Sequence, residues 1–267
     1  MIIYDCEIVK AIAKKDEPRI EGIEYCDGWR DFENMGISVI CAYDYAEDRY
    51  RVFTGDNMSA FQALVDDTDV VIGFNSLAFD NPLCRANGLN VSDDKSWDLL
   101  AEIWAGAGLP KKFESPTHIG FGLDACAAAN FGAQKSGNGA LAPIAWQRGE
   151  VGGVIDYCIN DVRLTKMLVD RVIDQGFIRD PRDAERIITV GAPGTPVEGT
   201  ARKPDFFEQG VLFAAAEIIS LHGETTIAAD VIHSAGLGNA DVSWMDDFDK
   251  RSLRKIMDNC GVDLQGL

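Results

Sequence analysis

Asp69-Val70-Val71-Ile72-Gly73-Phe74 decides the fold, because this stretch has the pattern of a strand buried on both faces. Its apolar residues follow one another without polar alternation, with acidic residues before them and Asn75 after them. Such a strand belongs inside a sheet whose two faces are covered by helices. The stretch therefore points to a sheet flanked by helices.

Three more strands are expected before this stretch, at residues 2–8, 36–43 and 49–53, where β-branched and aromatic residues gather. The simplest connection between them is an antiparallel meander. A helix then begins at Ser59, a suitable N-cap, and carries Phe61 on its apolar face.

The segments after residue 74 are mainly helical. We expect helices at 80–87, 97–104, 123–130 and 153–175, with a glycine-rich loop at 132–139. The order strand, strand, strand, helix, strand, helices predicts an α/β fold, a mixed β-sheet flanked by helices.

A different pattern begins near residue 191, where the sequence GAPGTPVEGTARKP is typical of a linker. Three further helices are expected at 206–221, 226–235 and 246–260. We therefore predict a first domain of residues 1–175, a linker of residues 176–205 and a small helical C-terminal domain of residues 206–267.

Composition narrows the class of protein. The 267 residues carry a formal charge of −18, which argues against nonspecific coating of nucleic acid but is compatible with carboxylates that bind divalent cations. No apolar run of membrane-spanning length occurs, and a soluble, cytoplasmic protein without a membrane partner is expected. The seven cysteines form no CxxC pair and the three histidines have no ligand spacing, which argues against a disulfide framework and a zinc site.

The residues suited to chemistry are acids at the ends of strands and on one helix. Asp5 and Glu7 are two apart in a strand, so their side chains point to the same face. Asp80 follows the buried strand, and Asp161 lies on the long helix one turn after Tyr157. Four carboxylates from three elements suit a pair of Mg²⁺ or Mn²⁺ ions, which stabilise both oxygens of a phosphoryl displacement.

Each motif also has a plain structural interpretation. In a chain with 43 acidic residues, an Asp-x-Glu pair is often a solvated sheet edge, and a Tyr and Asp one turn apart are often a surface pair. The functional interpretation gains from their order along the chain, because each motif falls on the element that a two-metal site needs.

Residues 1 to about 175 resemble the tyrosine-bearing branch of the DEDD-type 3′-to-5′ exonucleases of the ribonuclease H-like superfamily. The resemblance is carried by YDCE at 4–7, GFNSLAFD at 73–80 and YCINDV at 157–162. The second and third motifs look like those of family B DNA polymerase proofreading domains. The half as a whole resembles stand-alone predicted exonucleases, which have a Lys-Ser-Gly loop before the third motif, here at 135–139.

This resemblance implies a ribonuclease H-like fold and a metal-dependent exonuclease that shortens single-stranded DNA, or RNA, from a free 3′ end. It implies that Asp5, Glu7, Asp80 and Asp161 bind two divalent cations, Mg²⁺ or Mn²⁺, and that Tyr157 orients the attacking water. The sequence departs from the family at Ile8, where many members have Thr, which leaves local substrate contacts open.

Three further residues are candidates for substrate binding. Asn75 either bonds the terminal nucleotide or forms a turn, Phe79 either stacks on a base or packs in the core, and Lys135 either contacts a phosphate or is a solvated loop residue. Asp98 is expected to cap a helix or face solvent.

Two other functions stay open at this stage. One is a nucleic-acid-binding or protein-interaction module on the same fold with little catalysis, and the other is an endonuclease of the ribonuclease H type. In the C-terminal helices, the apolar residues form either a small core or a face for a protein partner. The basic residues at 250–255 either complement the helix dipole or form a DNA-recognition helix, and the dipole is the simpler interpretation.

Overall fold

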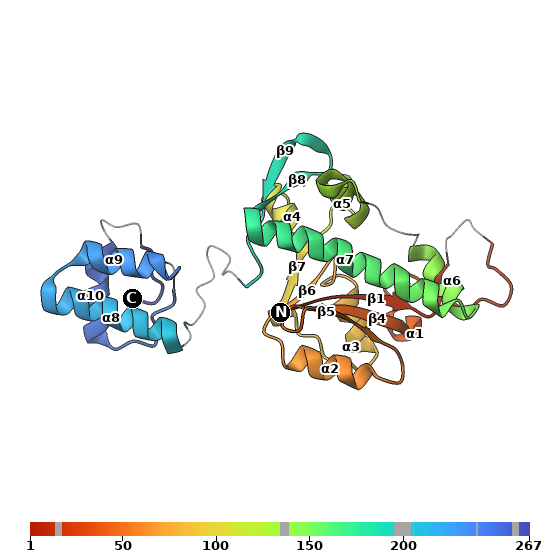
Figure 1. The fold of residues 1–267 in the computed structure, drawn as a ribbon, viewed down its shortest axis with the longest axis horizontal. Coiled ribbons are helices and arrows are strands. Elements are labelled where there is room, and N and C mark those ends of the chain that lie inside the picture. Colours follow the sequence, from red (N-terminus) through yellow and green to blue (C-terminus); the bar gives the residue numbers. More distant parts are fainter. Residues whose placement is uncertain (14–17, 134–138, 195–203, 205, 239, 258–261) are drawn as a thin grey trace. The chain divides into compact units, whose positions relative to one another are not determined.

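The chain forms two compact units, residues 1–194 and residues 195–267 (Figure 1). The computed structural model describes residues 1–13, 18–133, 139–194, 204, 206–238, 240–257 and 262–267. Of the predicted linker, residues 195–203 and 205 lie outside the described residues. Within the described part of the chain, no helix is both long and apolar enough to span a bilayer.

The first unit is built on a five-stranded sheet with the strand order β5-β4-β1-β6-β7. Its strands are β1 (Ile2–Ile8), β4 (Ile37–Asp44), β5 (Arg49–Phe53), β6 (Val71–Gly73) and β7 (Ser96–Asp98). β1, β4 and β5 form the predicted antiparallel meander, whereas β6 and β7 run parallel to β1. The predicted α/β fold class, a mixed sheet flanked by helices, is confirmed, and the C-terminal region is helical.

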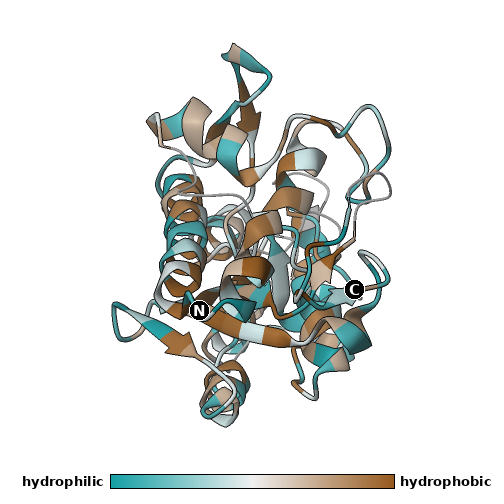
Figure 2. Cartoon of the chain, turned by 90° about the vertical axis from the view of Figure 1, so that its right-hand side faces the viewer, coloured by the Kyte–Doolittle hydropathy of each residue, from teal (hydrophilic) through white to brown (hydrophobic). Residues whose placement is uncertain are grey.

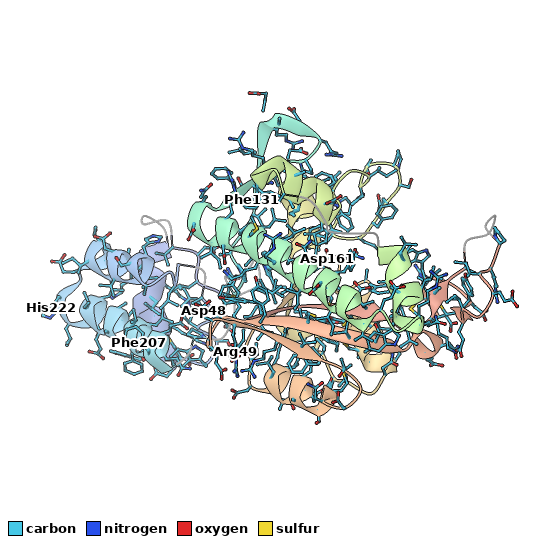
Figure 3. The ribbon with its side chains drawn as sticks, turned by 45° about the vertical axis from the view of Figure 1, so that its right-hand side comes forward. Asp48, Arg49, Phe131, Asp161, Phe207 and His222 are labelled. Atoms are coloured by element: carbon cyan, nitrogen blue, oxygen red, sulfur yellow. The ribbon has the colours of Figure 1, made fainter. Side chains whose placement is uncertain are left out.

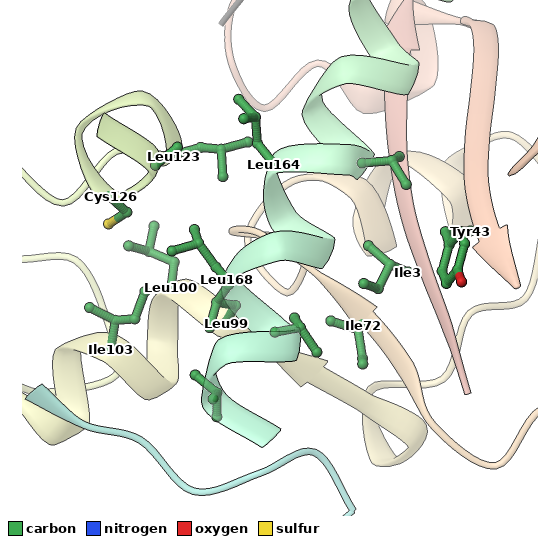
Figure 4. Packing of buried hydrophobic residues seen from close by; sticks show 14 of the residues in the cluster. Ile3, Tyr43, Ile72, Leu99, Leu100, Ile103, Leu123, Cys126, Leu164 and Leu168 are labelled. Atoms are coloured by element: carbon green, nitrogen blue, oxygen red, sulfur yellow. The ribbon is translucent and has the colours of Figure 1, made fainter. Parts of the chain in front are cut away.

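Helix α7 (Val151–Gln175) covers one face of the sheet and packs against β1 and β4. The core on this face includes Ile3 of β1, Ile72 of β6, and Leu164 and Leu168 of α7. Figure 4 shows Ile3 and Ile72 on one side of the helix and Leu164 and Leu168 on its other side. Because side chains alternate along a strand, Asp5 and Glu7 share the α7 face with Ile3.

The opposite face of the sheet is covered by α2 (Met58–Asp66) and α3 (Asp80–Ala86). The even-numbered residues of β1, among them Tyr4 and Cys6, join Phe61 of α2 and Leu83 of α3 in a second apolar cluster. β1 is thus buried on both faces, and its two acids replace apolar residues on only one of them.

Shorter elements surround the sheet. They are β2 (Ala11–Ile12), β3 (Tyr25–Cys26), α1 (Phe32–Met35), η1 (Asp93–Lys95), α4 (Leu99–Gly106), α5 (Leu123–Phe131), η2 (Gly139–Leu141) and α6 (Ala142–Gln147). Figure 2 shows hydrophobic and hydrophilic residues on the same helices, as expected of helices with one buried face.

Two sequence-based expectations differ from the structure. The helix predicted from residue 97 begins only at Leu99, because Trp97 and Asp98 belong to β7, which pairs with β6. Ser59 is not an N-cap, since it lies inside α2, which begins at Met58.

Residues 177–189 lie within the segment expected as linker and form a hairpin of β8 (Phe177–Asp180) and β9 (Asp183–Thr189). β8 packs against α5 and α7, and β9 packs against α4. The hairpin is held by Ile178 and Ile188, both of which are buried in the core under α7.

The second unit contains α8 (Phe206–His222), α9 (Thr225–Ser234) and α10 (Asp247–Met257). Its apolar cluster is its own and includes Leu212, Ile232, Leu253 and Ile256. The sequence left open whether the apolar residues of the C-terminal helices form a core or a face for a partner. Among them, Leu253 and Ile256 are core residues, while Phe248 is 53% exposed.

Candidate active site

The site is built first on β1, where Asp5 and Glu7 point towards α7. Asp5 is half-buried and Glu7 is only 8% exposed. From α7, the thiol of Cys158 lies 3.4 Å from the Asp5 carbonyl oxygen and 3.6 Å from Asp5 Oδ2. Possible ligand atoms of Asp5, Glu7 and Cys158 all lie within 4.8 Å of one another, a group that is able to hold a metal ion.

Asp80 joins this group because it opens α3 directly beside β1. Its Oδ1 accepts a hydrogen bond of 3.0 Å from the backbone N–H of Cys6, which lies between the two acids of β1. Asp80 is 4% exposed. Burial, with a smaller contribution from Cys84, raises the pKa of Asp80 well above its ordinary value, because a buried carboxylate loses its hydration.

Tyr157 and Asp161 are contributed by α7, one helical turn apart, and both are buried. Figure 3 shows Asp161 along the length of this helix. The Tyr157 ring passes close to the backbone at η2, where a Cβ built on Gly139 would lie 3.2 Å from the phenol oxygen. A glycine at 139 therefore leaves room for the hydroxyl.

These side chains meet in one cleft of about 960 Å³, which is lined by all four acids of the sequence motifs and by Tyr157. Asn75 and Phe79 also line it, whereas Lys135 lies outside the described residues. A second cavity of about 660 Å³ shares Asp5, Asp161 and other residues with the cleft. The structure thus brings seven of the eight candidate residues to one place, and their chemical roles stay predictions.

Asn75 adopts a left-handed backbone conformation, with φ 67°, within the turn out of β6. Its backbone N–H donates to Asp98 Oδ1 at 2.8 Å, and Leu77 N–H donates to Asp98 Oδ2 at 3.1 Å. Asp98 Oδ1 also accepts from Leu100 and Ala101 at the start of α4. Asp98 therefore caps a helix, as one of the two expectations had it, and also holds the loop that leads to Asp80.

Phe79 is half-buried and contacts two other rings edge-on, those of Trp29 and Phe32. Trp29 is 69% exposed and lines both cavities. The sequence contained no signal for Trp29, because its segment has no motif and no periodicity. Cys158 and Asp124, which also border the site, were not singled out either, although Cys158 stands next to Tyr157 in the third motif.

The donor set fits divalent cations. Asp5, Glu7, Asp80 and Asp161 offer carboxylate oxygens, the ligands that Mg²⁺ and Mn²⁺ prefer. Three of these four acids are buried, and none of the described residues that line the cleft is Lys or Arg. Buried carboxylates that converge without a cationic side chain are costly unless a cation compensates them.

No protein-family model matches this chain. No curated protein matches it either. Among solved structures, the chain is similar to the family B DNA polymerase from the hyperthermophilic archaeon Pyrobaculum calidifontis, with 16% sequence identity and a TM-score of 0.44. The match covers 64% of this chain and 24% of the polymerase chain, so it spans about a quarter of the polymerase's length.

Proposed function

We propose that the first unit is a metal-dependent 3′-to-5′ exonuclease that hydrolyses phosphodiester bonds of single-stranded DNA, with RNA as the second substrate to be compared. One observation carries the proposal: Asp5, Glu7, Asp80, Asp161 and Tyr157 line a single cleft, although they come from three separate elements. The likeness of YDCE, GFNSLAFD and YCINDV to the exonuclease motifs supports the 3′-to-5′ direction.

The four carboxylates would hold two divalent cations, Mg²⁺ or Mn²⁺. When bound, these ions supply positive charge for the scissile phosphate and favour ionisation of the attacking water. Cys6 N–H, which donates to Asp80 Oδ1, fixes one of these carboxylates relative to β1. The backbone therefore sets the spacing between Asp80 and the β1 acids before any ion binds.

Tyr157 would orient the attacking water, because its hydroxyl reaches the cleft from the same face of α7 as Asp161. A phenol can both donate to and accept from a water molecule, and the Tyr157 side chain is buried beside Gly139 of η2. Asn75 and Phe79 line the same cleft, which suits an amide bonded to the terminal nucleotide and an aromatic ring against its base.

The direct test is degradation of 5′-labelled oligonucleotides with Mn²⁺, on DNA and RNA, single and double stranded. The expected result is a ladder that shortens from the 3′ end, fastest on single strands. An Asp5→Asn Asp80→Asn variant should lose activity by at least ~10³-fold, because two of the proposed cation ligands are lost.

The matched control is Asp66→Asn Asp94→Asn, which makes the same change in charge at two exposed positions of the first unit. This control should keep the activity of the unaltered chain. Full activity of the Asp5→Asn Asp80→Asn variant would refute the proposal, and cuts in circular single-stranded DNA would indicate an endonuclease.

Metal binding is tested separately by calorimetry with Mn²⁺. Binding by the unaltered chain and its loss in Asp5→Asn Asp80→Asn would support the proposed ligands. Absence of Mn²⁺ binding by the unaltered chain would instead favour an inert binding module on this fold.

A further inference from the structure

The positive charge of the second unit is concentrated on α10. Among residues 204–267, the lysines and arginines are confined to four positions, Lys250, Arg251, Arg254 and Lys255. Four cations within six positions form an unusual group in a chain with a formal charge of −18. This concentration is a property of one helix rather than of the surface as a whole.

The helix separates these residues from its core face. Asp249, Ser252, Leu253 and Ile256 are buried, and Leu253 and Ile256 belong to the apolar cluster of the unit. Phe248, Arg251, Arg254 and Lys255 are exposed at i, i+3, i+6 and i+7, so they share the outer side of α10. We call these four residues the α10 outer face.

The helix dipole explains only part of the pattern. Arg254 and Lys255 lie in the last turn of α10, where cations interact favourably with the dipole. Lys250 and Arg251 lie nearer the middle of the helix, where this effect has faded. Lys250 donates to the Ser243 carbonyl oxygen at 2.9 Å, which gives it a structural role. Arg251 is left without such an explanation.

Of the acids at the start of α10, Asp247 is exposed one turn before Arg251, and the other two are occupied by the backbone or buried. Asp246 Oδ1 accepts from the backbone N–H groups of Phe248 and Asp249, and Asp249 itself is buried. None of the ion pairs found between described residues includes Arg251, Arg254 or Lys255. The three cations are therefore available to an anionic partner.

We propose that the α10 outer face binds the phosphate backbone of single-stranded nucleic acid, with Arg251, Arg254 and Lys255 on phosphates and Phe248 stacked on an unpaired base. This inference rests on the proposed function, since the partner would be the substrate of the first unit. Cations beside an exposed aromatic ring are the combination that binds single strands without regard to sequence.

A membrane surface fits the α10 outer face less well than single-stranded nucleic acid does. A helix that lies on a bilayer inserts its apolar face among the lipids, whereas the apolar face of α10 is used in the core of the second unit. Phe248 is the one large apolar residue on the α10 outer face, and a single ring supplies little insertion energy.

The contact would explain how so acidic a chain holds its substrate. A second binding element on the same chain raises the effective concentration of nucleic acid near the first unit, even when its own affinity is weak. The electrostatic part of that affinity must fall with added salt, because phosphate contacts release counterions.

The experiment measures binding of the full chain to fluorescein-labelled (dT)20 by anisotropy, in EDTA so that no hydrolysis occurs. Arg251→Gln Arg254→Gln should weaken binding about tenfold at low salt and make the salt dependence shallower by roughly 1.4 log units per log unit of salt. Phe248→Ala should weaken binding with no change in the salt slope, because stacking releases no counterions.

The control is Arg49→Gln Arg179→Gln, which removes the same charge from two exposed positions of the first unit. An equal loss in this control, or no binding by the unaltered chain, would overturn the inference. The unaltered chain is also tested on phosphatidylserine vesicles. If it bound them, and Arg251→Gln Arg254→Gln lost this binding but kept (dT)20 binding, the α10 outer face would be a membrane surface. This result would also overturn the inference.

A small substrate separates this inference from the proposed function. Hydrolysis of thymidine 5′-p-nitrophenyl phosphate with Mn²⁺ needs only the cleft, so Arg251→Gln Arg254→Gln should keep the full rate. Absence of this hydrolysis in the unaltered chain counts against the exonuclease. Normal hydrolysis together with unchanged (dT)20 binding in the variant counts against the α10 outer face alone.

Discussion

Asp98 is a buried carboxylate that holds the loop leading to the proposed cation site. Its two oxygens accept four backbone N–H groups from two segments, the 75–77 loop and the first turn of α4. Burial outweighs these bonds and raises the pKa of Asp98. The residue acts by position, because it fixes the loop between Asn75 and Asp80.

Asp98→Ala is expected to lower the free energy of unfolding by about 2–4 kcal/mol, since it leaves buried N–H groups without an acceptor and removes a helix cap. Asp98→Ser should recover part of this loss, because a serine still caps α4 but does not reach Leu77. Urea denaturation measures the free energy of unfolding of both variants. If the loop also serves catalysis, the turnover number should stay low in Asp98→Ser although its stability recovers. Recovery of stability and turnover number together in Asp98→Ser would indicate that Asp98 has a purely structural role.

Cys126 predicts how stability changes at alkaline pH. Burial, with a smaller contribution from Asp180, raises the pKa of this thiol from 9.0 to about 12. Above pH 9 the unfolded chain loses the thiol proton while the folded chain keeps it, so the free energy of unfolding falls as pH rises towards 12. The fall is at most about 1.4 kcal/mol per pH unit from this group.

Cys126→Ala should therefore lose less stability than the unaltered chain between pH 8 and pH 10, measured by urea denaturation at each pH. Tyrosine and lysine titrations are common to both proteins and cancel in the comparison. Equal losses would show that the thiol ionises normally in the folded state.

At the scale of elements, the turn out of β6 determines where Asp80 stands. A Cβ built on Gly73 would lie 2.4 Å from Ser76 Cβ and 2.6 Å from Ser76 Oγ, and Ser76 is 1% exposed. The loop thus folds back on the strand so closely that it needs a glycine at its start.

Gly73→Ala is expected to destabilise the chain by about 1–3 kcal/mol and to displace the loop towards α3. Adding Ser76→Gly should restore much of the loss, because it removes the atoms that clash, and a double-mutant cycle in urea measures the coupling. Gly153→Ala is the control: nothing lies within 4 Å of a Cβ there, and the residue is helical. It should raise stability by up to about 1 kcal/mol. If the double-mutant cycle showed no coupling energy between positions 73 and 76, the proposed clash between Gly73 and Ser76 would be refuted.

The strands could be predicted from the sequence where alternation and β-branched residues are strong. Asp5 and Glu7 were placed on one face by spacing alone, and the structure puts both on the cleft. β7 escaped prediction because Ser96, Trp97 and Asp98 have no strand pattern and run directly into a helix. Its strand character comes from pairing with β6, a contact between distant residues that no local pattern contains.

The environment of the site was predictable only in part for the same reason. Asp80 and Asp161 stood in motifs, whereas Trp29 reaches the cleft through tertiary packing on Phe79. The hairpin at 177–189 was missed because its strands have only two buried apolar residues, Ile178 and Ile188, which pair across the strands. The pairing of Ile178 with Ile188 exists only in the folded hairpin, and no local pattern in the sequence contains it.

At the scale of the whole molecule, the apolar cores are divided between the two units. One cluster lies under α7 between residues 3 and 190, a second lies between residues 2 and 91, and the third lies between residues 212 and 264. Among the described residues, no cluster draws on both units. Each unit therefore has its own hydrophobic source of stability.

The fragment 1–194 is accordingly expected to fold alone, with the urea midpoint that the first unit has in the full chain. It should hydrolyse thymidine 5′-p-nitrophenyl phosphate at the rate of the full chain, because every described residue of the cleft lies within it. Its affinity for (dT)20 should fall to that of Arg251→Gln Arg254→Gln or below, because the fragment lacks α10. An insoluble fragment, or one with a much lower midpoint, would mean that the second unit stabilises the first. A fragment that kept both hydrolysis and full affinity would place all binding in the first unit, and the charge of α10 would then serve its own helix.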